Sequence, residues 1–170
     1  MQKINIEILR MARESRLMTQ GELADAIGIE QGTLSKIEKD IFPPEDGTIK
    51  KIASVLNYPL EFFFLDKKII PVEGHYRRRS SISVKKMKQY IAQMTFAEHH
   101  LVTMLDEIDL PELNIPKWDI ETDGGPALCG KFMREFWKIP KGRITNLTKT
   151  LEDNGIVVIA LELGDLDGFS

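Results

Sequence analysis

Residues 18–39 read MTQGELADAIGIEQGTLSKIEK, and this stretch decides the fold of the N-terminal part of the chain. Thr19 and Glu22 form a capping-box pattern, in which the hydroxyl and the carboxylate each accept a backbone N–H at a helix start. The pattern predicts a helix that begins at Gln20. Gly28 follows the last apolar residue of that helix and can adopt the left-handed conformation that ends it. The next helix starts after a turn of about three residues, as a helix-turn-helix requires.

The segment 30–39 has the pattern of a helix that binds in the major groove of DNA. Such a helix needs short polar side chains near its N-terminus, which face base edges, and apolar residues on its back. Leu34 and Ile37 supply the apolar back. The predicted DNA contacts from this segment are Gln31, Gly32, Thr33, Ser35, Lys36 and Lys39. Glutamine can pair bidentately with adenine and lysine with guanine, each contact discriminating by about 1–3 kcal/mol.

Apolar residues recur at helical spacing on both sides of this stretch. Four stripes at intervals of three or four residues predict four amphipathic helices, and Pro59 permits a short fifth helix over 62–65. Short amphipathic helices must share a core to be stable. The stripes comprise Ile8, Leu9, Ala12 and Leu17; Leu23, Ala24 and Ile27; Leu34 and Ile37; and Ile49, Ile52, Ala53 and Leu56. We therefore expect a mainly α protein whose residues 1–66 form a five-helix domain.

Residues 18–29, Gln31 and the TLSKIE of residues 33–38 resemble the lambda-repressor-like, xenobiotic-response-element (XRE) family over roughly residues 4–66. The resemblance implies a transcriptional regulator whose partner is double-stranded DNA. It implies that Gln20 contacts the DNA backbone and sometimes a base, and that Thr33 holds a phosphate. Gln31, Gly32 and Lys36 would read bases.

The same resemblance implies that Arg13 and Glu38 form a structural pair that clamps the first helix to the third. Two departures from the family pattern are visible. Glu30 stands where the family often has Ser or Thr, and Gly32 lacks a side chain, so specificity would rest mainly on Gln31 and Lys36. One such domain binds DNA weakly, so we expect a homodimer that reads two half-sites.

Charge is unevenly distributed along the chain, although the net charge is only −3. Residues 1–66 carry 8 Lys+Arg against 11 Asp+Glu, residues 67–90 carry 8 against 1, and residues 91–170 carry 7 against 14. The segment 67–81 is therefore predicted to be a basic linker. Its lysines and arginines, with Lys85, Lys86 and Lys88, either form a solvated linker and helix start, or make nonspecific phosphate or partner contacts.

A long helix is predicted over 82–108, within a segment 82–110. Its apolar residues recur at intervals of three and four positions and form a seam along one face, which Glu98 interrupts. Two alternatives follow: the helix packs on its own C-terminal domain, or it pairs with a second copy of itself. The seam comprises Val84, Met87, Ile91, Met94, Leu101, Leu105 and Ile108.

Residues 111–170 are predicted to form an incomplete α+β domain. Helices are expected over 127–137 and 144–152, and the β-branched run 156–161 is expected to be a buried strand. A single strand needs a sheet, so the domain is either incomplete or completes its sheet with a partner chain.

The second half resembles the opening of the ImmA/IrrE-type metallopeptidase domain, through RRRSS at 77–81, LEDNGI at 151–156 and DGFS at 167–170. That family binds zinc with a His-Glu-x-x-His helix, which is absent from these residues, so we expect no peptidase activity from this chain. The resemblance leaves two alternatives, a truncated regulator-protease or a protein that lost its catalytic part.

Other residue patterns argue against catalysis and cofactors. Cys129 is the only cysteine, and His99 and His100 point in different directions on one helix, so we expect no disulfide and no metal site. No phosphate loop, catalytic triad, signal peptide or membrane span is visible, and we expect a cytoplasmic protein. We therefore interpret the chain as a DNA-binding repressor of phage or mobile-element type. The alternatives are a fragment of a zinc peptidase and an antitoxin-like module that binds a protein partner.

Overall fold

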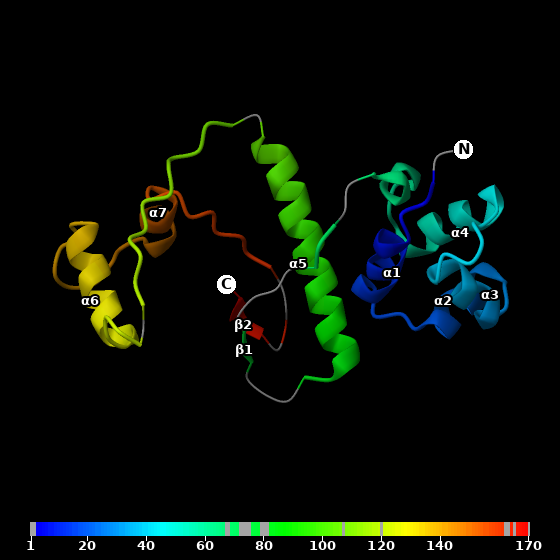
Figure 1. Ribbon diagram of the computed structural model, residues 1–170, viewed down its shortest axis with the longest axis horizontal. Helices are drawn as coiled ribbons and strands as arrows, with labels where there is room; N and C mark the ends of the chain where they lie inside the picture. Colours follow the sequence, from blue (N-terminus) through cyan, green and yellow to red (C-terminus); the bar gives the residue numbers. More distant parts are fainter. Residues whose placement is uncertain are drawn as a thin grey trace. The chain divides into compact units, whose positions relative to one another are not determined.

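The computed structural model describes residues 3–66, 69–71, 76–78, 82–106, 108–119, 121–161, 164 and 166–169. The chain divides into two compact units. The first unit comprises Met1–Asp106 and Glu162–Ser170, and the second comprises Glu107–Leu161. Figure 1 colours both along the sequence.

Five helical elements open the first unit: α1 (Ile6–Ser15), α2 (Gln20–Ile27), α3 (Gln31–Glu38), α4 (Asp46–Leu56) and η1 (Leu60–Phe64). The first four are the α-helices that the apolar stripes predict. The fifth is a five-residue 3-10 helix, close to the segment 62–65 where a short fifth helix is predicted. Because Pro59 precedes it and only five residues are helical, the segment is short enough for the tighter i→i+3 hydrogen bonding of a 3-10 helix.

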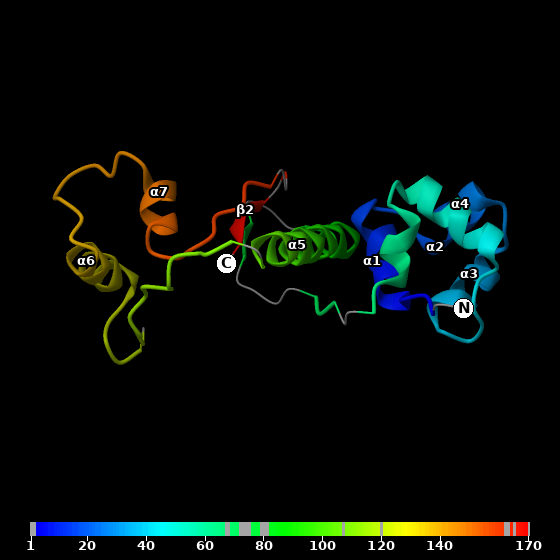
Figure 2. The same cartoon turned by 90° about the horizontal axis from the view of Figure 1, so that it is seen from above.

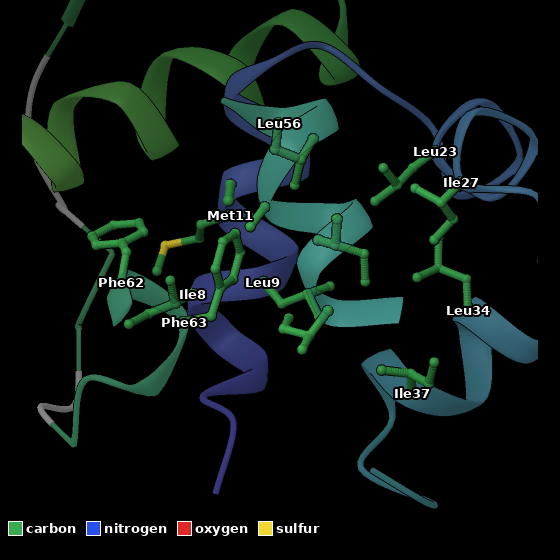
Figure 3. Packing of buried hydrophobic residues seen from close by; sticks show 14 of the residues in the cluster. Ile8, Leu9, Met11, Leu23, Ile27, Leu34, Ile37, Leu56, Phe62 and Phe63 are labelled. Atoms are coloured by element: carbon green, nitrogen blue, oxygen red, sulfur yellow. The ribbon is translucent and has the colours of Figure 1, made fainter. Parts of the chain in front are cut away.

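The predicted stripes meet in one hydrophobic core, and Figure 3 shows their side chains gathered between the helices. Ile8, Leu9, Leu23 and Leu34 are fully buried. Leu17 is an exception to the predicted stripe, because its side chain is 37% exposed. It lies beyond the end of α1 with a φ of 56°, so it belongs to the turn and not to the helix face.

The long helix α5 (Val84–Leu105) packs on α1, as both views of the chain show (Figures 1 and 2). Ala92 and Phe96 of α5 join the N-terminal core. The Phe96 ring lies 5.0 Å from the Phe62 ring and 5.6 Å from the Tyr58 ring, between centroids. Neither of the two packing alternatives drawn from the sequence included this contact.

Polar contacts also join α5 to the end of α1. The side-chain amides of Gln89 and Gln93 both donate to the backbone carbonyl of Ser15, at 3.3 and 3.2 Å. The apolar seam predicted for this helix is divided, since Met94 is buried whereas Val84 is 75% exposed. The face of α5 that contacts α1 is therefore only partly the predicted seam.

The second unit contains α6 (Pro126–Phe136) and α7 (Leu147–Glu152), close to the predicted ranges. None of the side chains of these helices is buried. Polar and aromatic contacts hold these segments together: Trp137 Nε1 donates to the carbonyl of Asn114 at 2.8 Å, and Trp118 lies 5.0 Å from Phe132 between ring centroids.

The predicted buried strand over 156–161 is wrong. These residues form no strand, and the side chains of Val157, Val158, Ile159 and Leu161 are each 40–44% exposed. A β-branched run becomes a strand only when a neighbouring strand pairs with it, and the described residues of the second unit offer none. An incomplete α+β domain over 111–170 is therefore not supported.

Two short strands of the first unit pair instead: β1 (Tyr76–Arg78) and β2 (Leu166–Phe169). The pairing is antiparallel, with Tyr76 opposite Phe169 and Arg78 opposite Leu166. Most of the predicted basic linker 67–81, including Lys67, Lys68 and Arg79, lies outside the described residues. In the described part of the chain, no helix is both long and apolar enough to cross a bilayer.

The α5 contact predicts that Phe96→Ala destabilises the N-terminal helices. Phe96 is only 4% exposed, so the truncation should lower the free energy of unfolding by about 3–5 kcal/mol. Urea denaturation followed by circular dichroism measures this. Val102→Ala is the matched control on the same helix, because Val102 is 56% exposed and should change stability by about 0.5 kcal/mol or less. Equal stability of the two variants would contradict the packing.

Candidate DNA-binding surface

The start of α2 has the capping geometry that its sequence predicts. Thr19 Oγ1 accepts the backbone N–H of Glu22 at 3.2 Å, and the Glu22 carboxylate accepts the backbone N–H of Thr19. The helix therefore begins at Gln20. It ends at Gly28, whose φ of 74° is left-handed. This places α3 after a short turn and brings the N-termini of α2 and α3 onto one side of the domain.

The hydrogen bonds at this cap lower the pKa of Glu22 from 4.5 to about 2. The backbone N–H of Thr19 is the main cause, followed by the Thr19 hydroxyl and Lys85. All of these groups favour the ionised carboxylate. Glu22 is therefore a fixed negative charge at neutral pH, two residues from Gln20.

The predicted contact residues of α3 divide by exposure. Gln31, Gly32, Lys36 and Lys39 are exposed, and Thr33 and Ser35 are half-buried. Leu34 and Ile37 are buried on the opposite side of the helix, where Figure 3 shows them pointing into the core. The polar side of α3 is thus available to a ligand over its full length.

Below this surface lies a buried ion pair between α1 and α3. Arg13 Nε donates to Glu38 Oε1 at 2.7 Å, and Arg13 Nη2 donates to Glu38 Oε2 at 2.9 Å. The two side chains are only 9% and 3% exposed. Arg13 Nη1 also donates to the carbonyl of Met18, at 2.7 Å. A bidentate pair of this kind holds both helices in one geometry.

The ion pair continues to the surface through two glutamines. Gln20 Nε2 donates to Glu38 Oε2 at 2.8 Å, and Gln31 Nε2 donates to Gln20 Oε1 at 3.1 Å. We call Arg13, Glu38, Gln20 and Gln31 the glutamine relay. Its hydrogen bonds connect Gln20 and Gln31, the first residues of α2 and α3, to the buried ion pair. Sequence reasoning placed Gln20 and Gln31 separately and missed their contact, although each is the first residue of one of two consecutive helices.

The relay determines how the Gln31 amide is presented. Because one N–H of Nε2 is used on Gln20, the other N–H and the Oε1 atom remain for a ligand. Adenine offers an N7 acceptor and an N6 donor side by side in the major groove, which is the complement of one amide donor and one amide acceptor. The arrangement thus fits an adenine edge.

An open cleft of about 660 Å³ adjoins the relay. It is lined by residues of α1, α2, α3 and the first turns of α5, including Gln20, Gln31, Val84, Lys85 and Lys88. In the described residues, no three His, Cys, Asp or Glu side chains lie close enough together to hold a metal ion.

Comparison with known proteins supports only about the N-terminal third of the chain. A helix-turn-helix family model matches residues 9–63, which supports a helix-turn-helix domain of the XRE type in these residues. No curated protein and no solved structure matches the chain. The resemblance of the second half to an ImmA/IrrE-type peptidase domain is not supported.

The lowered pKa of Glu22 predicts how stability depends on pH. A carboxyl with a depressed folded-state pKa stabilises the fold above its unfolded pKa of about 4.5 and loses that contribution as pH falls towards 2. Glu22→Gln should therefore be less stable than the wild type at pH 7, and the difference should shrink below pH 4.5. Thermal denaturation from pH 7 to pH 3 measures it. A difference as large at pH 3 as at pH 7 would contradict the assignment.

The buried ion pair predicts a larger effect for Glu38→Gln. This change leaves Arg13 buried without a countercharge, which should lower the free energy of unfolding by about 3–5 kcal/mol. Glu7→Gln is the control, because Glu7 is paired with Arg10 on the surface and is 56% exposed. Glu7→Gln should lower the free energy of unfolding by about 1 kcal/mol or less, as measured by urea denaturation. Similar urea midpoints for Glu38→Gln and Glu7→Gln would show that the buried ion pair adds no more stability than the exposed one.

Proposed function

We propose that this protein is a sequence-specific DNA-binding transcriptional regulator that inserts α3 into the major groove. The glutamine relay carries the proposal. The hydrogen bonds of the relay hold the exposed Gln31 amide in one orientation. Holding a surface side chain in one rotamer costs conformational entropy. Hydrogen bonds to a base edge would offset this cost.

Each polar residue of α3 has a role in this proposal. Gln31 pairs with an adenine, and Lys36 follows Gly32 by one helical turn and pairs with a guanine further along the groove. Gly32 adds no side chain, so the backbone of α3 can approach the bases closely. Thr33, Ser35 and Lys39 contact phosphates beside the groove and fix the register of the helix.

The active species in this proposal is a homodimer that acts as a repressor. One recognition helix contacts only a few base pairs, and helix-turn-helix dimers bind half-sites about 34–36 Å apart. Repression needs nothing beyond occupancy of a promoter, so a chain that binds DNA through α3 could repress without contacting polymerase. A regulator of phage or mobile-element type would have this simple organisation.

A second candidate function is a module that binds a protein partner, as an antitoxin does. Two observations favour it. Residues 1–66 carry 8 Lys+Arg against 11 Asp+Glu, and Ile41 and Phe42, next to α3, are 62% and 39% exposed. Exposed apolar side chains beside acidic groups fit a protein surface better than a phosphate backbone.

The test is selection of duplexes from a randomised 20-base-pair library, followed by fluorescence-anisotropy titration of the selected duplex. The double variant Gln31→Ala/Lys36→Ala should lose two contacts of at least about 1 kcal/mol each, or roughly thirtyfold in affinity. Lys50→Ala is the control, because Lys50 is an exposed cation on α4. It should bind like the wild type.

Two outcomes would contradict the proposal. Enrichment of no sequence, with weak binding that is equal in all three proteins, would favour the protein-binding module. Tight, selective binding that survives the double variant would show that α3 does not read the bases.

A further inference from the structure

The first turns of α5 lie beside Gln20 and Gln31, although Lys85 follows Gln31 by 54 residues in sequence. Lys85 Nζ lies 3.2 Å from Glu22 Oε2, and Lys88 Nζ lies 3.6 Å from Glu14 Oε1. Both lysines line the same cleft as Gln20 and Gln31. A ligand that contacts the two glutamines would therefore meet these lysines at its edge.

The position of these lysines is unfavourable for α5 itself. The N-terminus of a helix carries a partial positive charge and prefers acidic side chains. Residues 84–97 nevertheless contain three lysines and no Asp or Glu. Lys85 and Lys88 also remain 45% and 58% exposed, so they are not needed to fill space in the core.

The docking of α5 does not depend on these lysines. Phe96 and Ala92 bury its apolar side in the core, and Gln89 and Gln93 bind the carbonyl of Ser15. The pairs with Glu14 and Glu22 lie at the surface, where an ion pair contributes about 1 kcal/mol or less. A phosphate group could replace either carboxylate as the partner of its lysine.

The charge of the N-terminal domain favours lysines that exchange a carboxylate partner for a phosphate. Binding to DNA requires cations that face phosphates, yet residues 1–66 have three more acidic than basic side chains (11 against 8). Among the residues whose side chains the structure describes, the lysines of α5 are the first cations after residue 66. They stand next to the N-terminus of α2.

We propose that Lys85 and Lys88 bind phosphates of the DNA strand beside α2, outside the bases that α3 contacts. The DNA-binding unit thus includes α5, and its cations compensate for the acidic helix-turn-helix. This inference rests on the proposed function. The lysines of α5 increase the affinity for DNA of any sequence, whereas α3 selects the bases.

The test uses the full chain and the variant Lys85→Gln/Lys88→Gln, which removes both charges and keeps a flexible polar side chain at each position. Probes are the selected duplex and a 30-base-pair duplex of mixed sequence. Each lost phosphate contact should reduce the slope of log affinity against log salt by about 0.9, so the double variant should lose about 1.8 on both duplexes. The ratio of the two affinities should stay the same.

Lys50→Gln/Lys131→Gln is the matched control, because both lysines are exposed and lie on α4 and α6. It removes the same charge and should keep the wild-type slope. A slope for Lys85→Gln/Lys88→Gln equal to that of the control would overturn the inference while leaving the proposed function intact. The same holds if the variant is merely less stable in urea and its slope is unchanged. A wild type that binds neither duplex would overturn both proposals.

Discussion

The buried ion pair between Arg13 and Glu38 is the interaction on which the surface depends. A carboxylate that is 3% exposed must be compensated, and Arg13 satisfies both of its oxygens while joining α1 to α3. The same carboxylate accepts the amide of Gln20, so one buried charge both fixes the helices and orients the side chain that contacts Gln31. The proposed function therefore couples stability and base recognition in this domain.

The helix α5 likewise combines a packing role with a surface role, although it lies outside the helix-turn-helix. Its aromatic contact through Phe96 completes a core that the short helices form between them. The same docking brings the basic start of α5 to the edge of the proposed DNA surface. A helix outside the matched residues 9–63 thus contributes both apolar and charged groups to the N-terminal unit.

Sequence reasoning succeeded where the signal is local. The capping box at Thr19 and Glu22, the left-handed Gly28 and the apolar stripes each depend on residues within one or two turns, and these elements are present. It failed where a partner is distant in sequence. The run 156–161 has strand propensity, but the described residues place no strand beside it. The packing of α5 on α1 and the contact between Gln31 and Gln20 required three-dimensional proximity. The remaining contact residues of α3 stay predictions until DNA is bound.

Substitution of single adenines shows whether Gln31, held by the glutamine relay, pairs with an adenine as proposed. Each adenine of the selected duplex is replaced in turn by 7-deazaadenine, which lacks the N7 acceptor. We expect one adenine per half-site at which the substitution lowers wild-type affinity about tenfold, the worth of one hydrogen bond. At that adenine the affinity of Gln31→Ala should not fall further. If both proteins were equally sensitive at every adenine, Gln31 would not pair with an adenine.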